Sequence, residues 1–158
     1  MRYSFQETAL IILSALLIAS CSSPKPIVAR PLSEATSVEI ALRSASSVFV
    51  TSFGTTDAAA RFSLLLKQEL SDQGFTTAND PKDADLVLTG VFEQGWANGR
   101  SQALATVSGA SRSGSRIWSG DFPPLVFIYP TNDPTKRLVV SIVNQLREDV
   151  DELQKRYK

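Results

Sequence analysis

The stretch ADLVLTGVF, residues 84–92, decides the fold because it is nearly continuous in apolar side chains. A run of this length is typical of a central strand that is covered on both faces. The residues on either side of it must then supply the neighbouring strands and the helices that cover the sheet.

Before this stretch, the chain predicts a strand, a helix and a short second strand. Residues 48–53 (VFVTSF) are β-branched and aromatic, as in a strand. Residues 58–73 are expected to form an amphipathic helix, with Asp57 as its N-cap and Gly74 just after its end. Residues 75–78 follow as a short strand. The buried face of the helix is expected to consist of Ala59, Phe62, Leu65, Leu66 and Leu70.

After this stretch, the chain predicts a β-hairpin. Residues 94–100 contain two glycines and an asparagine and are expected to form a loop. An alternating strand, a glycine-centred turn and a returning strand are then expected at residues 101–111, 112–116 and 117–122. Pro123 and Pro124 are expected to stop the returning strand. Residues 125–129 are either an edge strand or a segment laid over the core.

The C-terminal segment has the clearest helical pattern. Asp133 and Pro134 suit the N-cap and the first position of a helix. Apolar residues then recur at spacings of 4, 3, 4, 3 and 4 at Val139, Val143, Leu146, Val150, Leu153 and Tyr157. Packing of this stripe on the domain's own sheet is the favoured explanation, and a self-associating coiled coil is the alternative.

The order of these elements predicts a two-layer α/β (α+β) domain, with a small mixed sheet and helices mainly on one face. We assign residues 46–158 to this single domain, since the chain of 158 residues is long enough for one domain with a modest core. Residues 34–45 alternate like a strand but also fit one face of a helix, and we favour the helix.

The N-terminus has the features of a secretory signal. Residues 9–18 (ALIILSALLI) form an apolar run that is shorter than the roughly 20 residues of a membrane-spanning helix. Apolar runs of about 7–15 residues followed by small residues are typical of a signal peptide. We therefore assign residues 1–20 to a signal peptide. The alternatives are a secreted protein with a free thiol and an uncleaved membrane helix.

Cys21 is the only cysteine of the chain and directly follows this segment. The sequence Ile18-Ala19-Ser20-Cys21 resembles the lipobox of bacterial lipoproteins. The resemblance implies that the Cys21 thiol becomes a thioether carrying diacylglycerol and that the chain is cut before Cys21. It also implies that the new amine receives a fatty acyl chain such as palmitate. Two or more acyl chains give stable membrane anchoring.

The residues after Cys21 bear on where the protein is held. In lipoproteins of Gram-negative bacteria, an Asp at the next position commonly causes retention at the inner membrane. Ser22 lacks that signal, so the resemblance implies an outer-membrane protein that faces the periplasm. Residues 21–45 begin with a segment rich in proline and serine and are expected to form a flexible tether.

The composition argues against several kinds of chemistry. The 16 basic and 16 acidic residues cancel, so the charge suggests no nucleic-acid partner. The chain has no histidine, which removes histidine-based catalysis and most zinc sites. Asp80, Asp83 and Asp85 lack the spacing of a calcium loop and are expected to form a solvated turn. We therefore expect no enzymatic activity, no metal and no cofactor.

Two tryptophans are candidate contacts for a protein partner. Trp96 lies in the segment GWANG, where it either contacts a partner or covers the domain's own core. Trp118 follows Ile117 in a predicted strand, so a core or half-buried position is favoured for it. Both are kept as candidate contact residues.

The order of motifs resembles a known group of envelope domains. Ala84 to Gly90 (ADLVLTG) and Ile117 to Gly120 (IWSG) are similar to motifs of the N-terminal domain of TolB, of CsgG and of LpoB-type peptidoglycan synthase activators. The resemblance covers residues 46–122 and implies a non-catalytic binding module. We therefore expect a lipid-anchored envelope binding or scaffold protein with a periplasmic partner. The alternatives are a subunit of a secretion system or homo-oligomer and a cell-wall-associated enzyme.

Overall fold

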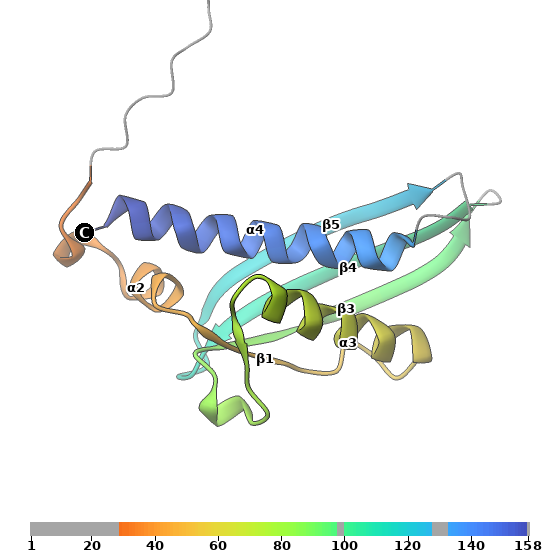
Figure 1. The fold of residues 1–158 in the computed structure, drawn as a ribbon, viewed down its shortest axis with the longest axis horizontal. Helices are drawn as coiled ribbons and strands as arrows, with labels where there is room; N and C mark the ends of the chain where they lie inside the picture. The colour runs from red at the N-terminus through yellow and green to blue at the C-terminus, as the bar shows by residue number, and fades with distance from the viewer. Residues whose placement is uncertain (1–28, 98–99, 128–132, 158) are drawn as a thin grey trace, which may run out of the picture.

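The structure is a computed structural model that describes residues 29–97, 100–127 and 133–157 (Figure 1). The predicted signal peptide and Cys21 lie outside the described residues. The helices are η1 (Leu32–Glu34), α2 (Ser37–Arg43), α3 (Asp57–Asp72), η2 (Pro81–Asp83) and α4 (Pro134–Arg156). The strands are β1 (Ser47–Val50), β2 (Thr76–Thr77), β3 (Leu86–Ala97), β4 (Arg100–Ser111) and β5 (Arg116–Phe127).

The strands form a mixed sheet in the order β2-β1-β3-β4-β5. β1 is parallel to β2 and β3, whereas β4 is antiparallel to both of its neighbours, β3 and β5. The stretch 84–92 therefore supplies the middle strand, as predicted. A Cβ atom at Gly90 would lie 2.0 Å from the carbonyl oxygen of Thr106 on β4, so this strand needs a glycine there.

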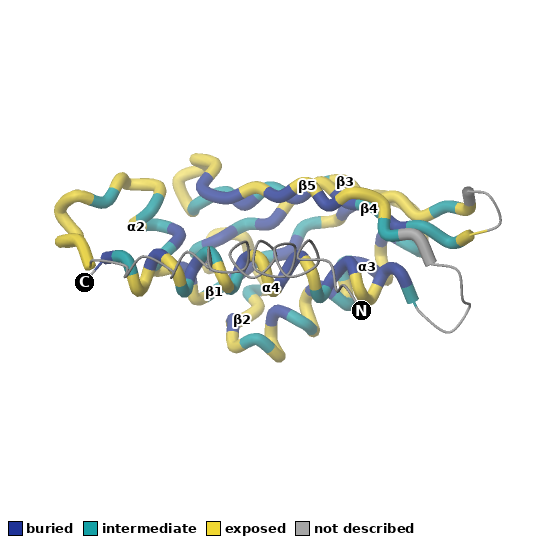
Figure 2. Tube along the Cα trace, turned by 90° about the horizontal axis from the view of Figure 1, so that it is seen from above, coloured by how far each residue is buried: buried dark blue, intermediate teal, exposed yellow. Residues whose placement is uncertain are grey.

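Helices α2, α3 and α4 cover one face of the sheet, which confirms the two-layer fold class (Figures 1 and 2). Leu86, Leu88 and Phe92 of β3 are buried beneath them. The prediction that this strand is covered on both faces was wrong. Thr89 and Val91 point to the opposite face and are exposed, since alternate residues of a strand face opposite sides.

The two long helices pack as their apolar patterns predict. All six residues of the C-terminal stripe, from Val139 to Tyr157, are buried in the domain's own core. The stripe is therefore not available for a coiled coil with another copy. On α3, Phe62 stacks on Phe92 with ring centroids 4.4 Å apart and meets the edge of Phe53 at 5.0 Å.

The ends of these helices are set by capping groups. Asp133 caps α4 as predicted, because its carboxylate accepts a hydrogen bond of 3.0 Å from the Thr135 amide. The N-cap of α3 is Thr56 rather than the predicted Asp57, since the Thr56 hydroxyl accepts from the Ala59 amide at 3.1 Å. Gly74 follows the helix with a φ of 87°, which glycine adopts without strain.

The three long strands extend further than the sequence suggests. Most of the predicted loop 94–100 is strand, because β3 continues to Ala97 and β4 begins at Arg100. β5 also continues through Pro123 and Pro124 instead of stopping there. The prolines are tolerated because β5 is an edge strand, and its register with β4 shifts between Ala103 and Ala105.

Residues 37–45, which precede the predicted domain boundary, belong to the packed fold. Residues 37–43 form α2, in agreement with the favoured helix, and a capping box between Thr36 and Glu39 starts it. Leu42 and Ala45 are part of the core. The domain therefore begins before the predicted boundary at residue 46. Among the described helices, none has the length and apolar character to cross a bilayer.

Candidate interaction surfaces

The folded domain has two opposite ends that are built from different elements (Figure 1). At the end that we call the α2 end lie η1, α2, the last turn of α4 and the β4–β5 turn at residues 112–115. At the opposite end, which we call the strand tip, lie the end of β3 and the start of β4. α4 runs between the two ends, and its 23 residues correspond to a length of about 35 Å.

Trp96 lies at the strand tip and is 77% exposed. It pairs with Ser101 in the β3–β4 ladder, on the same face of the strand as the buried Phe92. The strands extend past the described helices at this end (Figure 1). Trp96 therefore does not cover the core, and its role as a contact residue stays a prediction.

Trp118 lies in the core, as the sequence favoured. Its side chain is 5% exposed, and its Nε1 donates a hydrogen bond of 2.8 Å to an Asp149 carboxylate oxygen on α4. Its ring also lies 6.5 Å from that of Phe122. Trp118 fastens α4 to β5, and in this conformation it is not accessible to a partner.

The chain enters the fold at the α2 end, nine residues after Cys21. The Arg30 amide donates to the Arg156 carbonyl at 2.7 Å, and Arg30 forms an isolated parallel bridge with Tyr157. The Tyr157 hydroxyl donates to Glu39 of α2 at 2.9 Å. These contacts fix the first described residues beside the C-terminus of α4.

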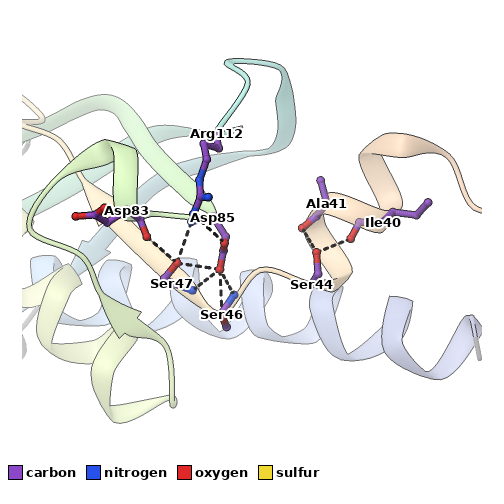
Figure 3. A network of polar contacts seen from close by, with 8 residues as sticks. All are labelled: Ile40, Ala41, Ser44, Ser46, Ser47, Asp83, Asp85 and Arg112. Atoms are coloured by element: carbon purple, nitrogen blue, oxygen red, sulfur yellow. Dashed lines mark hydrogen bonds and ion pairs between the residues drawn. The ribbon is translucent and has the colours of Figure 1, made fainter.

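A second set of polar contacts at this end is centred on Asp85 (Figure 3). One carboxylate oxygen of Asp85 accepts from the Ser47 hydroxyl at 2.8 Å and the Ser47 amide at 3.0 Å. It also accepts from the hydroxyl and the amide of Ser46, at 3.1 and 3.2 Å. The other oxygen faces Arg112 at 3.7 Å. Asp85 thus ties the start of β1 and the β4–β5 turn to the start of β3.

The pKa of Asp85 follows from these contacts. Its partial burial alone would raise the pKa, but the hydrogen bonds from Ser47 and Ser46 outweigh burial and lower it. The pKa of Glu39 is also lowered, by hydrogen bonds from the amide and hydroxyl of Thr36 and from Tyr157. Both carboxylates are therefore held in their charged form.

An open pocket of about 390 Å³ lies between α2 and the β4–β5 turn. Its walls carry serine hydroxyls, Asp85 and Arg112, with apolar surface from Val38, Ala41 and Ile117. Several of these polar groups already satisfy each other, such as Ser111 and Ser113, whose hydroxyls are 2.8 Å apart. These contacts hold the β4–β5 turn in place, as does the hydrogen bond of 2.8 Å from the Gly114 amide to the Ser111 carbonyl.

Sequence reasoning missed the role of Asp85. It placed this residue with Asp80 and Asp83 in a solvated turn, whereas the structure separates their roles. Asp80 caps η2 through the Lys82 amide at 2.8 Å, and Asp85 reaches serines 38 and 39 residues away in the sequence. No local pattern signals such a pairing. Among the described residues, no group of three or more His, Cys, Asp or Glu side chains is close enough to hold a metal ion.

No protein-family model matches this chain, and no curated protein matches it in sequence. Among solved structures, the chain is similar to PelC from Paraburkholderia phytofirmans, in a variant solved as a dodecamer. The identity is 17% and the TM-score 0.52, over 66% of this chain and 89% of that chain. A second PelC dodecamer gives 18% identity and a TM-score of 0.49, over 66% and 88%.

A minor lipoprotein from Acinetobacter baumannii is also similar, with 15% identity and a TM-score of 0.41, over 69% of this chain and 94% of that chain. At these identities a likeness concerns the fold alone, and it is the TM-score of 0.52 that supports it. The resemblance to the TolB, CsgG and LpoB domains stays a prediction. The first PelC structure therefore shows that this arrangement of sheet and helices occurs in an experimentally solved protein.

Proposed function

We propose that this protein is a lipid-anchored envelope protein that acts by binding, not by catalysis. In this proposal Cys21 carries the acyl chains, and the domain presents its strand tip to a protein partner in the periplasm. The observation that carries the proposal is the arrangement of the two ends. The chain enters the domain beside Arg156, while the exposed Trp96 lies at the opposite end (Figure 1).

This arrangement limits how far the α2 end can lie from the membrane. Nine residues from Cys21 to Arg30 span at most about 30 Å when fully extended. The α2 end therefore stays near the bilayer that holds the acyl chains. The strand tip lies about 35 Å from the α2 end, taking the length of α4 as about 1.5 Å per residue, and in this proposal it points away from the bilayer.

The strand tip has properties that suit a protein contact. Tryptophan is among the residues that most often dominate the energy of protein interfaces. Trp96 is exposed in the free chain, and its neighbours on the same face of the sheet are the exposed Gln94 of β3 and the half-buried Ser101 of β4. A large apolar side chain with polar neighbours is typical of the centre and rim of a contact surface.

Attachment to the outer membrane is the finer part of this proposal. It depends on the lipobox resemblance and on Ser22, which lacks the retention signal of an Asp at that position. The similarity to PelC is in fold and does not bear on the membrane involved. Fractionation of inner and outer membranes on a sucrose gradient tests this part.

A second candidate function is that of a subunit in a homo-oligomeric envelope assembly. The PelC structures that share this fold are dodecamers. Since the stripe of α4 is buried internally, another surface would have to join the copies. The sheet face opposite the helices, with Val91 exposed and Val87 and Leu104 half-buried, is the surface we propose for that contact. Light scattering of the purified domain over a range of concentrations distinguishes an oligomer from a monomer.

The membrane anchor is tested with Cys21→Ser in the full chain. We expect the variant to lose acylation and to leave the membrane fraction after a high-salt wash. A variant that remains with the membranes would show that the anchor lies elsewhere.

The partner surface is tested by photo-crosslinking in cells from position 96. Position 64 is the matched control, because Leu64 is also a large apolar side chain and is 67% exposed on α3. We expect a discrete protein adduct from position 96 only. Equal adducts from both positions would argue against the strand tip as the contact. Hydrolysis of cell-wall fragments by the purified domain would contradict a purely binding role.

A further inference from the structure

The exposed apolar side chains are unevenly distributed. Six large apolar side chains of the described residues are exposed, and three of them lie between residues 32 and 40. Leu32 of η1 is 38% exposed, and Val38 and Ile40 of α2 are each 41% exposed. The other three, Leu64, Val91 and Trp96, are spread over α3 and the sheet. The concentration in η1 and α2 therefore needs its own explanation.

The core does not explain it. α2 uses Leu42 to pack into the domain. Two residues apart on a helix corresponds to about 200°, so Ile40 lies on the face opposite Leu42. Glu39 occupies a third side, where it meets Tyr157 and Arg156. Figure 3 shows the Ile40 side chain directed away from the contacts around Asp85.

The position in the chain suggests what these side chains meet. The contact of Arg30 with the end of α4 places η1 and α2 directly after the nine-residue link to Cys21. A lipidated Cys21 would hold this end within about 30 Å of the bilayer surface, even with the link fully extended. No other described part of the molecule is tied so closely to the anchor.

The charges at this end also suit a lipid surface. Arg30 and Lys155 are exposed and form no ion pair with any described residue, and the Arg112 side chain is 64% exposed beside Asp85. On the acidic side, Glu39 and Glu152 are both paired with Arg156. Glu34 is the exposed acid of η1. The basic and acidic side chains named here are equal in number, and anionic lipids would attract the exposed Arg30 and Lys155, which form no ion pair with a described residue.

We propose that the α2 end is a membrane-contacting surface. Ile40 of α2 and Leu32 of η1 contact the headgroups of the bilayer that holds the anchor, and Arg30 and Lys155 face anionic lipids. Val38 is about 200° from Ile40 around α2 and lines the pocket beside the β4–β5 turn instead. The proposal rests on lipidation of Cys21, and it adds that the domain lies against the membrane with its strand tip pointing away.

The test uses the lipidated full chain in vesicles of phosphatidylethanolamine and phosphatidylglycerol. Lipidation consumes the Cys21 thiol, so a cysteine introduced by Ile40→Cys is the single site for an environment-sensitive fluorophore. Leu64→Cys is the matched control, as both native side chains are exposed apolar residues on helices. Nitroxide-labelled lipids then report whether each fluorophore contacts the bilayer. Flotation with the vesicles is measured in the same samples.

We expect the fluorophore at position 40 to shift to shorter wavelength and to be quenched by the nitroxide lipids, while position 64 changes little. A second labelled variant carries the fluorophore on Ser33→Cys instead. We expect the further substitution Ile40→Glu to abolish the quenching of this fluorophore without preventing flotation. Flotation without quenching at position 40 would overturn the membrane contact and leave the anchor standing. Failure to float would overturn both. A wavelength shift that persists in Cys21→Ser without vesicles would mean that preceding residues of the chain cover Ile40, which would also overturn the contact.

Discussion

The α2 end and the strand tip are held in different ways. At the α2 end, side chains that are far apart in the sequence bond to each other, as in the contacts of Glu39 with Tyr157 and of Asp85 with Ser47. At the strand tip, β3 and β4 extend past the helices and are joined by the hydrogen bonds of their ladder. The difference suggests that the end nearest the proposed anchor is fixed, while the end offered to a partner can adjust to it.

The largest expected effect on stability comes from a core substitution in α4, the helix that runs between the two ends. Leu146 of α4 is fully buried in the core. We expect Leu146→Ala to lower the free energy of unfolding by about 2–5 kcal/mol, as buried leucine truncations do. Urea denaturation measures it. Leu64→Ala, at an exposed leucine, should change the free energy of unfolding by less than about 0.5 kcal/mol. Equal effects of the two substitutions would contradict the core placement of α4.

A smaller loss of stability is expected from a substitution at the α2 end, and it should leave the strand tip unchanged. Asp85→Asn replaces a carboxylate by a neutral amide. One oxygen of that carboxylate accepts four hydrogen bonds from Ser46 and Ser47. Because Asp85 is partly exposed, we expect a loss of about 1 kcal/mol in the free energy of unfolding. Amide hydrogen exchange should become faster at the start of β1 and in the β4–β5 turn. Asp121→Asn, at an exposed carboxylate of β5, is the control.

Faster exchange at the strand tip in Asp85→Asn would mean that the two ends are coupled, and the comparison would then fail.

Lowering the pH should destabilise the α2 end before it destabilises the strand tip. Glu39 and Asp85 have pKa values in the folded protein below their ordinary values of 4.5 and 3.8. Their contribution to stability is therefore present above those ordinary values and is lost as the pH falls through the folded values. Hydrogen exchange at a series of pH values, corrected for the intrinsic rates, measures this. Unchanged protection of α2 down to the lowest pH would argue against a role for Glu39.

The smallest effect on stability is expected at Trp96. Since its indole is exposed, Trp96→Ala should change the free energy of unfolding by no more than about 0.5 kcal/mol. With the photo-crosslinker placed at position 101, opposite Trp96 on β4, the same substitution should abolish the adduct with the partner. Trp118→Ala provides the contrast, because it deletes a buried ring and its bond to Asp149. A large loss of stability in Trp96→Ala would show that the strand tip is part of the core.

The fold could be predicted where one local pattern controls one element. The stripe from Val139 to Tyr157 and the caps Asp133 and Pro134 gave α4 correctly, since helix periodicity and capping are local properties. The strand ends were not predictable in this way. The glycines near Trp96 suggested a loop, but pairing with β4 extends β3 through Gly95 to Ala97.

The candidate surfaces were less predictable than the fold. The Asp85 contacts depend on residues 38 and 39 positions away, which a local pattern cannot reveal. The exposure of Trp96 depends on where the helices stop relative to the strands, which is a property of the whole arrangement (Figure 1). Cys21 differs from Asp85 and Trp96, because its resemblance to a lipobox depends only on the residues directly before it in the sequence.

The two prolines within β5 also determine how copies of this protein could associate. Proline has no amide hydrogen to offer to an added strand, so Pro123 and Pro124 interrupt the outer edge of the sheet. α2 packs against β5 as well. The sheet therefore ends at β5 and does not continue as a ribbon from one molecule into the next. Strand addition between copies would therefore have to use the other edge of the sheet, where β2 has only two residues.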